Sequence, residues 1–122
     1  MGNAYDCLQE ARARASLELY KGACSRAYYA YFDTVRALLA TVDVETRSHS
    51  GAHNLFSQHF VKNGPFTAQD SRFMSRLFLM RQSSDYDMET QVEWADTEEA
   101  IEVTAEFLLQ VEAYLKQNGF TA

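Results

Sequence analysis

The chain contains few residues that break a helix. Its 122 residues include one proline, Pro65, and five glycines. Because proline cannot continue a helix and glycine weakens one, this scarcity favours long uninterrupted helices. The length fits one domain, so we predict a single domain over residues 1–122. The hydrophobic content of 47% and the charged content of 23% are ordinary for a globular domain and exclude wholesale disorder.

Cysteine is also scarce, and no apolar run approaches the length of a membrane-spanning helix. We expect a helical hairpin that turns at Lys21–Gly22, which lies about 15 residues, or ~22 Å of helix, after Cys7. Cys7 and Cys24 would then be too far apart to form a disulfide. Two unpaired thiols suit a reducing cytosol. The first residues carry no signal-peptide pattern, so we predict a soluble cytoplasmic protein without membrane contact.

Positive charge is in short supply. The 11 lysines and arginines face 17 aspartates and glutamates, for a net charge of −6. Such a chain repels a phosphate backbone on average, so we expect neither a broad nucleic-acid binder nor a DNA-binding protein. Most of its cations are arginines, whose planar fork suits phosphate or carboxylate. The arginines could therefore line a local phosphate site. The simpler alternative is that they form ion pairs at the surface.

Apolar residues recur at helical spacing in five segments, which we place at about 4–20, 23–42, 50–62, 68–84 and 96–118. Asn63–Gly64–Pro65 is a strong helix stop. Thr67 and Asp70 resemble a capping box, and Asp96 begins an acidic first turn. No repeat and no strand-like alternation is visible. We therefore predict an all-α, four- to five-helix up-and-down bundle in which segment 23–42, apolar on several sides, is central.

The stretch from residue 25 to residue 32, SRAYYAYF, interleaves arginine with aromatic residues. Arg26 and Tyr29 could hold and stack a nucleotide. Alternatively, the aromatic side chains simply pack the core of the bundle.

The stretch from residue 47 to residue 53, RSHSGAH, places His49 and His53 four residues apart. Two metal ligands could share a helical face at this spacing, but no third ligand stands at a recognised distance, so we predict no metal site and no cofactor. His49 either shapes the start of its helix or serves as a polar site residue.

The stretch from residue 81 to residue 87, RQSSDYD, lies where a helix is expected to end. Arg81 could face a phosphate while Asp85 and Tyr86 hold it in place. Alternatively, Arg81 and Asp85 form a local i, i+4 pair above Tyr86. Outside these stretches the common catalytic motifs are absent: no GxSxG, Gly-rich phosphate loop, HExxH or CxxC occurs.

Together, three stretches resemble the small prokaryotic HEPN proteins: YKGACSRAYYAYFDTVRALL, RSHSGAHNLFSQHFVKNG and RQSSDYD. They fall in the family's order, and with the flanking helices the resemblance covers nearly the whole chain. It implies a four- to five-helix bundle, commonly a homodimer, often paired with a minimal nucleotidyltransferase in toxin–antitoxin modules. Some HEPN proteins are metal-independent endoribonucleases. Their motif is an Arg followed, after four to six residues, by a His, and these side chains are brought together across the dimer.

This sequence departs from the ribonuclease pattern. Counted from Arg81, the motif histidine would fall at residue 86, 87 or 88, which are Tyr86, Asp87 and Met88. The general acid–base group of the ribonuclease is therefore missing. Met88 also stands where the tyrosine that is adenylylated in the His–x–Tyr version would fall. Arg81 fits the family pattern, and Asp85 and Tyr86 fit a subgroup without the histidine.

We therefore predict a non-catalytic, dimeric HEPN module that engages a nucleotidyltransferase, a nucleotide or RNA. The residues expected to line its cleft are Arg26, Tyr29, His49, Arg81, Asp85 and Tyr86. One alternative is an endoribonuclease with a variant site, in which Arg81 stabilises the phosphate and Asp85 or His49 moves the proton. Another is a structural scaffold whose aromatic residues all belong to the core.

Overall fold

The computed structural model describes residues 1–86 and 93–120, with only the backbone described over 83–86. Within these ranges it contains helices and no strand, which confirms the predicted all-α bundle. The elements are α1 (Gly2–Ser16), α2 (Tyr20–Ala40), α3 (His49–Phe56), the π-helical turn η1 (Ser57–Val61), α4 (Ala68–Tyr86) and α5 (Trp94–Gln117).

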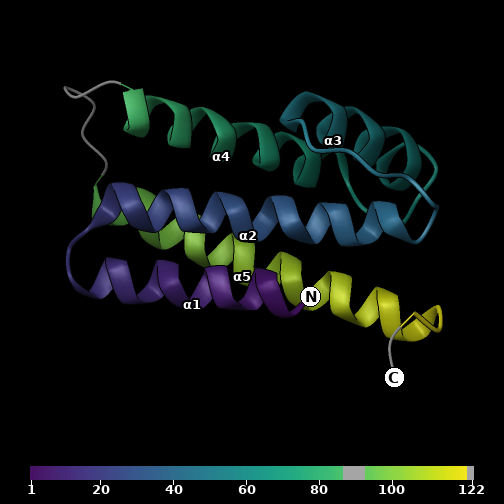
Figure 1. The fold of residues 1–122 in the computed structure, drawn as a ribbon, viewed down its shortest axis with the longest axis horizontal. Coiled ribbons are helices and arrows are strands. Elements are labelled where there is room, and N and C mark those ends of the chain that lie inside the picture. The colour runs from purple at the N-terminus through teal and green to yellow at the C-terminus, as the bar shows by residue number, and fades with distance from the viewer. Residues whose placement is uncertain (87–92, 121–122) are drawn as a thin grey trace.

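Helix α2 is the centre of the bundle, as its many apolar sides predicted. It packs against each of the other four α-helices. In Figure 1, α3 and α4 lie on one side of α2, and α1 and α5 lie on the other. Since every neighbour buries a different stripe of α2, this helix needs apolar residues around most of its circumference.

The core joins α2, α4 and α5 through stacked aromatic side chains. Tyr31 and Phe107 stack with their ring centroids 4.0 Å apart and their planes within 5°. The Tyr31 hydroxyl donates a hydrogen bond of 2.8 Å to the Asp70 carbonyl at the start of α4. Burial raises the pKa of Tyr31, so its phenol remains an uncharged donor. This single side chain therefore ties three helices together.

The break predicted at Lys21–Gly22 is wrong, because both residues lie inside α2. The turn falls earlier, at residues 17–19, where Glu18 takes a positive φ of 62° and the backbone N–H of Leu19 donates to the Arg14 carbonyl. Gly22 instead permits a close approach, since a Cβ atom there would lie 2.9 Å from Arg14 Nη1. Both cysteines are buried and free, as the prediction of unpaired thiols required.

The third predicted helix is confirmed, with its last turn widened into η1. The stop after it depends on Gly64. A Cβ atom at this position would lie 2.5 Å from the carbonyl oxygen of Phe60. The prediction that α5 starts at Asp96 is off by two residues. Glu93 is the N-cap, and Asp96 is its partner in a capping box at the third helical position.

We expect Gly64→Ala to destabilise the protein by about 1–3 kcal/mol, because the added methyl overlaps backbone atoms that cannot move alone. Gly2→Ala is a matched control, since a Cβ atom at Gly2 meets nothing within 4 Å. Urea unfolding followed by circular dichroism measures both variants. Equal unfolding midpoints for the two would contradict the close approach at Gly64.

Candidate functional site

A pocket of about 500 Å³ opens where the start of α3 meets α2 and α4. Arginine, histidine and aromatic side chains line it, and among the residues whose side chains the structure describes, 1–82 and 93–120, no carboxylate does. The lining residues are Tyr28, Tyr29, Phe32, Arg47, His49, Ser50, Phe78 and Arg81. We call it the Arg81 pocket. In a chain with 17 aspartates and glutamates, two arginines at one pocket are a local concentration of positive charge.

The start of α3 is built by the RSHSG stretch. Ser48 is the N-cap, and its hydroxyl accepts a hydrogen bond of 3.0 Å from the backbone N–H of Gly51. A Cβ atom at Gly51 would lie 2.6 Å from Thr46 Oγ1 and 2.7 Å from Ser48 Oγ. Glycine at this position therefore lets the cap close. The closed cap places His49, the first helical residue, at the Arg81 pocket.

His49 is held on two sides. Its ring stacks on Phe78, with the centroids 3.8 Å apart and the planes within 10°. Its Nδ1 atom lies 3.2 Å from the hydroxyl oxygen of Tyr28. Burial, aided by the nearby His53, lowers the pKa of His49 below its usual 6.5. The imidazole is therefore neutral at pH 7, and Nε2 is the nitrogen left to meet a ligand.

Arg81 reaches the pocket from α4 and lies against two tyrosines of α2. Its guanidinium carbon is 5.0 Å from the centre of the Tyr29 ring and 5.4 Å from that of Tyr28. Both distances are within the range of cation–π attraction. Burial raises the pKa of Tyr28 to about 12, although the charge of Arg81 opposes the rise. Tyr28 thus stays an uncharged phenol near neutral pH.

The structure brings three of the predicted site residues together at the Arg81 pocket: Tyr29, His49 and Arg81. Arg26 lies beside them without lining the pocket. Its Nε atom is 3.1 Å from a carboxylate oxygen of Glu10 on α1, and its guanidinium carbon is 5.9 Å from the Tyr29 ring. The side chains of Asp85 and Tyr86 lie outside the described residues, and so do Asp87 and Met88.

Sequence reasoning missed five residues of the pocket as site residues: Tyr28, Phe32, Arg47, Ser50 and Phe78. Arg47 immediately precedes the N-cap of α3, so its place in the RSHSG stretch was a usable signal. Tyr28 and Phe78 belong to apolar stripes whose spacing is that of any core residue. Nothing in the sequence alone distinguishes the stripe residue that stacks on a histidine from one that fills the core.

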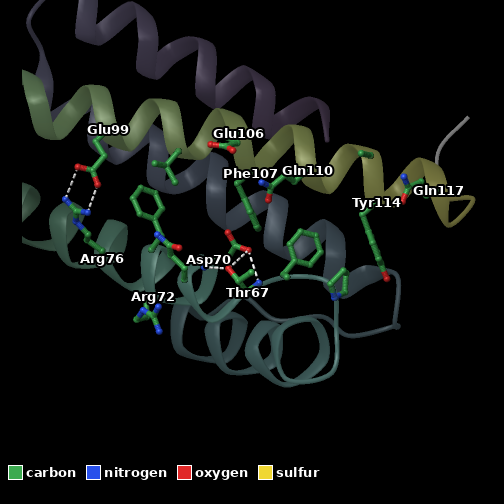
Figure 2. Close-up of a pocket in the computed structure, with 16 residues that line it drawn as sticks. Thr67, Asp70, Arg72, Arg76, Glu99, Glu106, Phe107, Gln110, Tyr114 and Gln117 are labelled. Carbon is green, nitrogen blue, oxygen red and sulfur yellow. Dashed lines mark hydrogen bonds and ion pairs between the residues drawn. The ribbon is translucent and has the colours of Figure 1, made fainter.

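A second large cavity, between α4 and α5, has a different character. Figure 2 shows Arg76 paired with Glu99 across it and Asp70 hydrogen-bonded to Thr67. Its lining also includes Glu106, so its cations are matched by carboxylates. Within residues 1–82 and 93–120, no group of three or more His, Cys, Asp or Glu side chains is placed to hold a metal ion. No helix in the described part of the chain is long and apolar enough to cross a membrane.

A central helix covered by four others, with a pocket of arginine, histidine and aromatic side chains on one side, defines a small helical-bundle domain. The family model of the HEPN domain matches residues 1–114, and the chain belongs to the HEPN-domain family. The predicted family resemblance is thereby confirmed.

Individual relatives align over most of the chain. "Putative toxin MJ0142" of Methanocaldococcus jannaschii is 30% identical over 98 residues, which cover 80% of this chain and 67% of that protein. A UPF0332 protein of Thermotoga maritima is 30% identical over 113 residues, 93% of this chain and 86% of the relative. The UPF0332 protein glr0978 of Gloeobacter violaceus is 31% identical over 118 residues, 90% and 94% of the two chains.

Proposed function

We propose that residues 1–122 form one cytoplasmic HEPN domain that acts as a dimeric binding module in a toxin–antitoxin context. Its Arg81 pocket holds the phosphate of a nucleotide or of RNA, and its partner is a minimal nucleotidyltransferase. The family membership supports this proposal, together with the name toxin that two relatives from Methanocaldococcus jannaschii carry.

The composition of the Arg81 pocket is the observation that carries the proposal. Arg81 and Arg47 supply two planar forks that match phosphate oxygens. The faces of Tyr29 and His49 offer surfaces on which a base or a ribose can pack. The described side chains that line the pocket are basic, aromatic or hydroxyl-bearing, and such groups suit an anion.

Exposed apolar side chains at one end of the bundle support the dimer and the protein partner. Leu17 is 70% exposed, Leu19 54% and Trp94 51%. They belong to the α1–α2 turn and to the start of α5, which lie at the same end of the bundle in Figure 1. Exposed apolar side chains gathered at one end of a bundle favour its association with another protein surface.

Two measurements test the binding module. Calorimetric titration with adenosine monophosphate is expected to give saturable binding at low salt that weakens as salt is added. Light scattering is expected to give twice the mass of 13.9 kDa. A monomer that binds neither the nucleotide nor a co-expressed nucleotidyltransferase would overturn the proposal and leave a structural scaffold as the better account.

A second candidate function is metal-independent RNA cleavage, because His49 and Arg81 line the same pocket. In that reaction His49 Nε2 takes the proton from a ribose 2′-hydroxyl, the 2′ oxygen bonds to phosphorus, and the 5′ oxygen leaves with a proton from water. Arg81 would stabilise the charge on the phosphate. A base at Nε2 requires the tautomer whose Nδ1–H donates to Tyr28.

Cleavage by His49 predicts a particular pH profile. Since the pKa of His49 lies below 6.5, the rate should stay level near pH 7 and fall only as the pH drops through this lowered value. His49→Gln should remove the activity, and a chelator should not. An assay with labelled single-stranded RNA measures the pH profile, the activity of His49→Gln and the effect of the chelator. Activity that survives in His49→Gln would exclude this histidine as the base.

A further inference from the structure

A groove of about 980 Å³ runs between α3–η1 and α4, and no carboxylate lines it among residues 1–82 and 93–120. Its lining consists of basic, hydroxyl, amide and apolar residues. They are His53, Asn54, Ser57, Gln58, Val61, Lys62, Ala68, Ser71, Arg72, Ser75, Arg76 and Leu79. By contrast, the cavity between α4 and α5 and the one at the end of α2 each include several aspartates or glutamates. Among the described residues, the lining of this groove therefore carries basic groups without the aspartates and glutamates found in those two cavities.

The floor of the groove is a chain of hydrogen-bonding groups. Ser57 Oγ lies 2.6 Å from Ser71 Oγ, and Ser71 Oγ lies 3.0 Å from His53 Nε2. Ser71 is only 7% exposed, so this polar cluster is fixed in place by the fold. Hydroxyl protons can rotate toward an anion, which makes the cluster suited to phosphate oxygens. Ser57 also begins the π-helical turn η1, a kind of turn often found at functional sites.

The rim of the groove carries cations. Lys62 and Arg72 are exposed, and neither forms an ion pair with a carboxylate in the described part of the chain. Arg76 differs, since it is engaged by both oxygens of Glu99. Two cations beside the hydroxyl groups of Ser57 and Ser71 are therefore available to a phosphate in this groove.

The groove and the Arg81 pocket are neighbours along the same pair of helices. His49 lines the pocket and His53 the groove, with their ring centroids 6.1 Å apart. On α4, Phe78 belongs to the pocket and Ser75 to the groove. One extended ligand could therefore contact both sites along the same face of α3 and α4.

We propose that the groove is a second phosphate subsite, which makes the preferred ligand a single-stranded oligoribonucleotide. The strand runs from the Arg81 pocket past His49 and His53 to Lys62 and Arg72. The proposal rests on the proposed function of the Arg81 pocket and deepens it. The aromatic faces of the Arg81 pocket favour a nucleic acid over an acidic peptide, because bases stack on aromatic rings.

The test compares adenosine monophosphate with a labelled four-nucleotide RNA, by calorimetry and fluorescence anisotropy. Wild-type protein should bind the RNA about tenfold or more tightly than the nucleotide, because each added charge-assisted contact contributes on that order. The double variant Lys62→Gln/Arg72→Gln should lose this gain and keep its affinity for the nucleotide. The slope of log affinity against log salt should become shallower by about 1.4 when two phosphate contacts are lost.

The matched control is Arg12→Gln/Lys21→Gln, which removes the same charge from α1 and α2 away from the groove. It should bind RNA as the wild type does, and thermal unfolding checks that both double variants are folded. An RNA gain that survives Lys62→Gln/Arg72→Gln overturns the second subsite and leaves the proposed function standing. Failure of the wild type to bind either ligand overturns both. Displacement of the RNA by tetraglutamate at equal concentration overturns the assignment to RNA.

Discussion

Arg81→Ala is expected to weaken the binding of adenosine monophosphate by about 10- to 100-fold. A hydrogen bond to a charged group contributes about 1.5–3 kcal/mol, and each 1.4 kcal/mol is a factor of ten. Arg81→Lys keeps the charge and loses the planar fork, so its affinity should lie between those of wild type and alanine. Calorimetric titration at one low salt concentration measures all three proteins.

A neighbouring arginine provides the control for Arg81. Arg26 also lies near the Tyr29 ring, at 5.9 Å, but its guanidinium is paired with Glu10 and lies outside the pocket. Arg26→Ala removes the same charge and should change nucleotide affinity less than threefold, as expected for an exposed pair. If Arg26→Ala weakened binding as much as Arg81→Ala, net charge and not the Arg81 pocket would explain the loss.

Phe107→Ala is expected to cost about 3–5 kcal/mol of unfolding free energy. Phe107 is only 2% exposed, stacks on Tyr31 and makes edge-to-face contacts with Phe56 and Phe66. Its removal would leave a cavity where α2, α4 and α5 join. Since a domain of this size is stable by about 5–15 kcal/mol, the variant should unfold at a much lower urea concentration.

Leu109 lies on the same helix and is 64% exposed, so Leu109→Ala is the matched control. Its expected cost is within about 0.5 kcal/mol. Urea unfolding followed by tryptophan fluorescence, with circular dichroism as a second probe, gives both values. Similar costs for the two substitutions would mean that the stack of Tyr31 and Phe107 does not join the helices as described.

The helices were predictable because their signals are local. Apolar spacing placed each of them, and the glycine and proline at residues 64 and 65 marked a true stop. The first turn was mispredicted because glycine has two uses. Gly22 makes room for Arg14, while Glu18 accepts the left-handed conformation that glycine usually supplies. A sequence alone does not distinguish a glycine used for space from one used for a turn.

Residues of the site were predictable only where they stand in a recognisable sequence motif. Tyr29, His49 and Arg81 were named because they stand in three stretches that resemble the HEPN family, and the fold brings them to one pocket. Arg26, one turn before Tyr29, is directed instead to Glu10 on α1. Phe78 was missed because its role depends on the ring of His49, which is distant in sequence. Such contacts follow from helix packing and leave no local pattern.

The most direct test of the Arg81 pocket follows the imidazole of His49 by NMR during a titration with adenosine monophosphate. A phosphate held beside His49 favours its charged form, so its pKa should rise from the lowered value of the free protein. The resonances of the Arg81 side chain should shift over the same ligand concentrations. An unchanged His49 pKa, with shifts confined to the cavity between α4 and α5, would contradict phosphate binding in the Arg81 pocket.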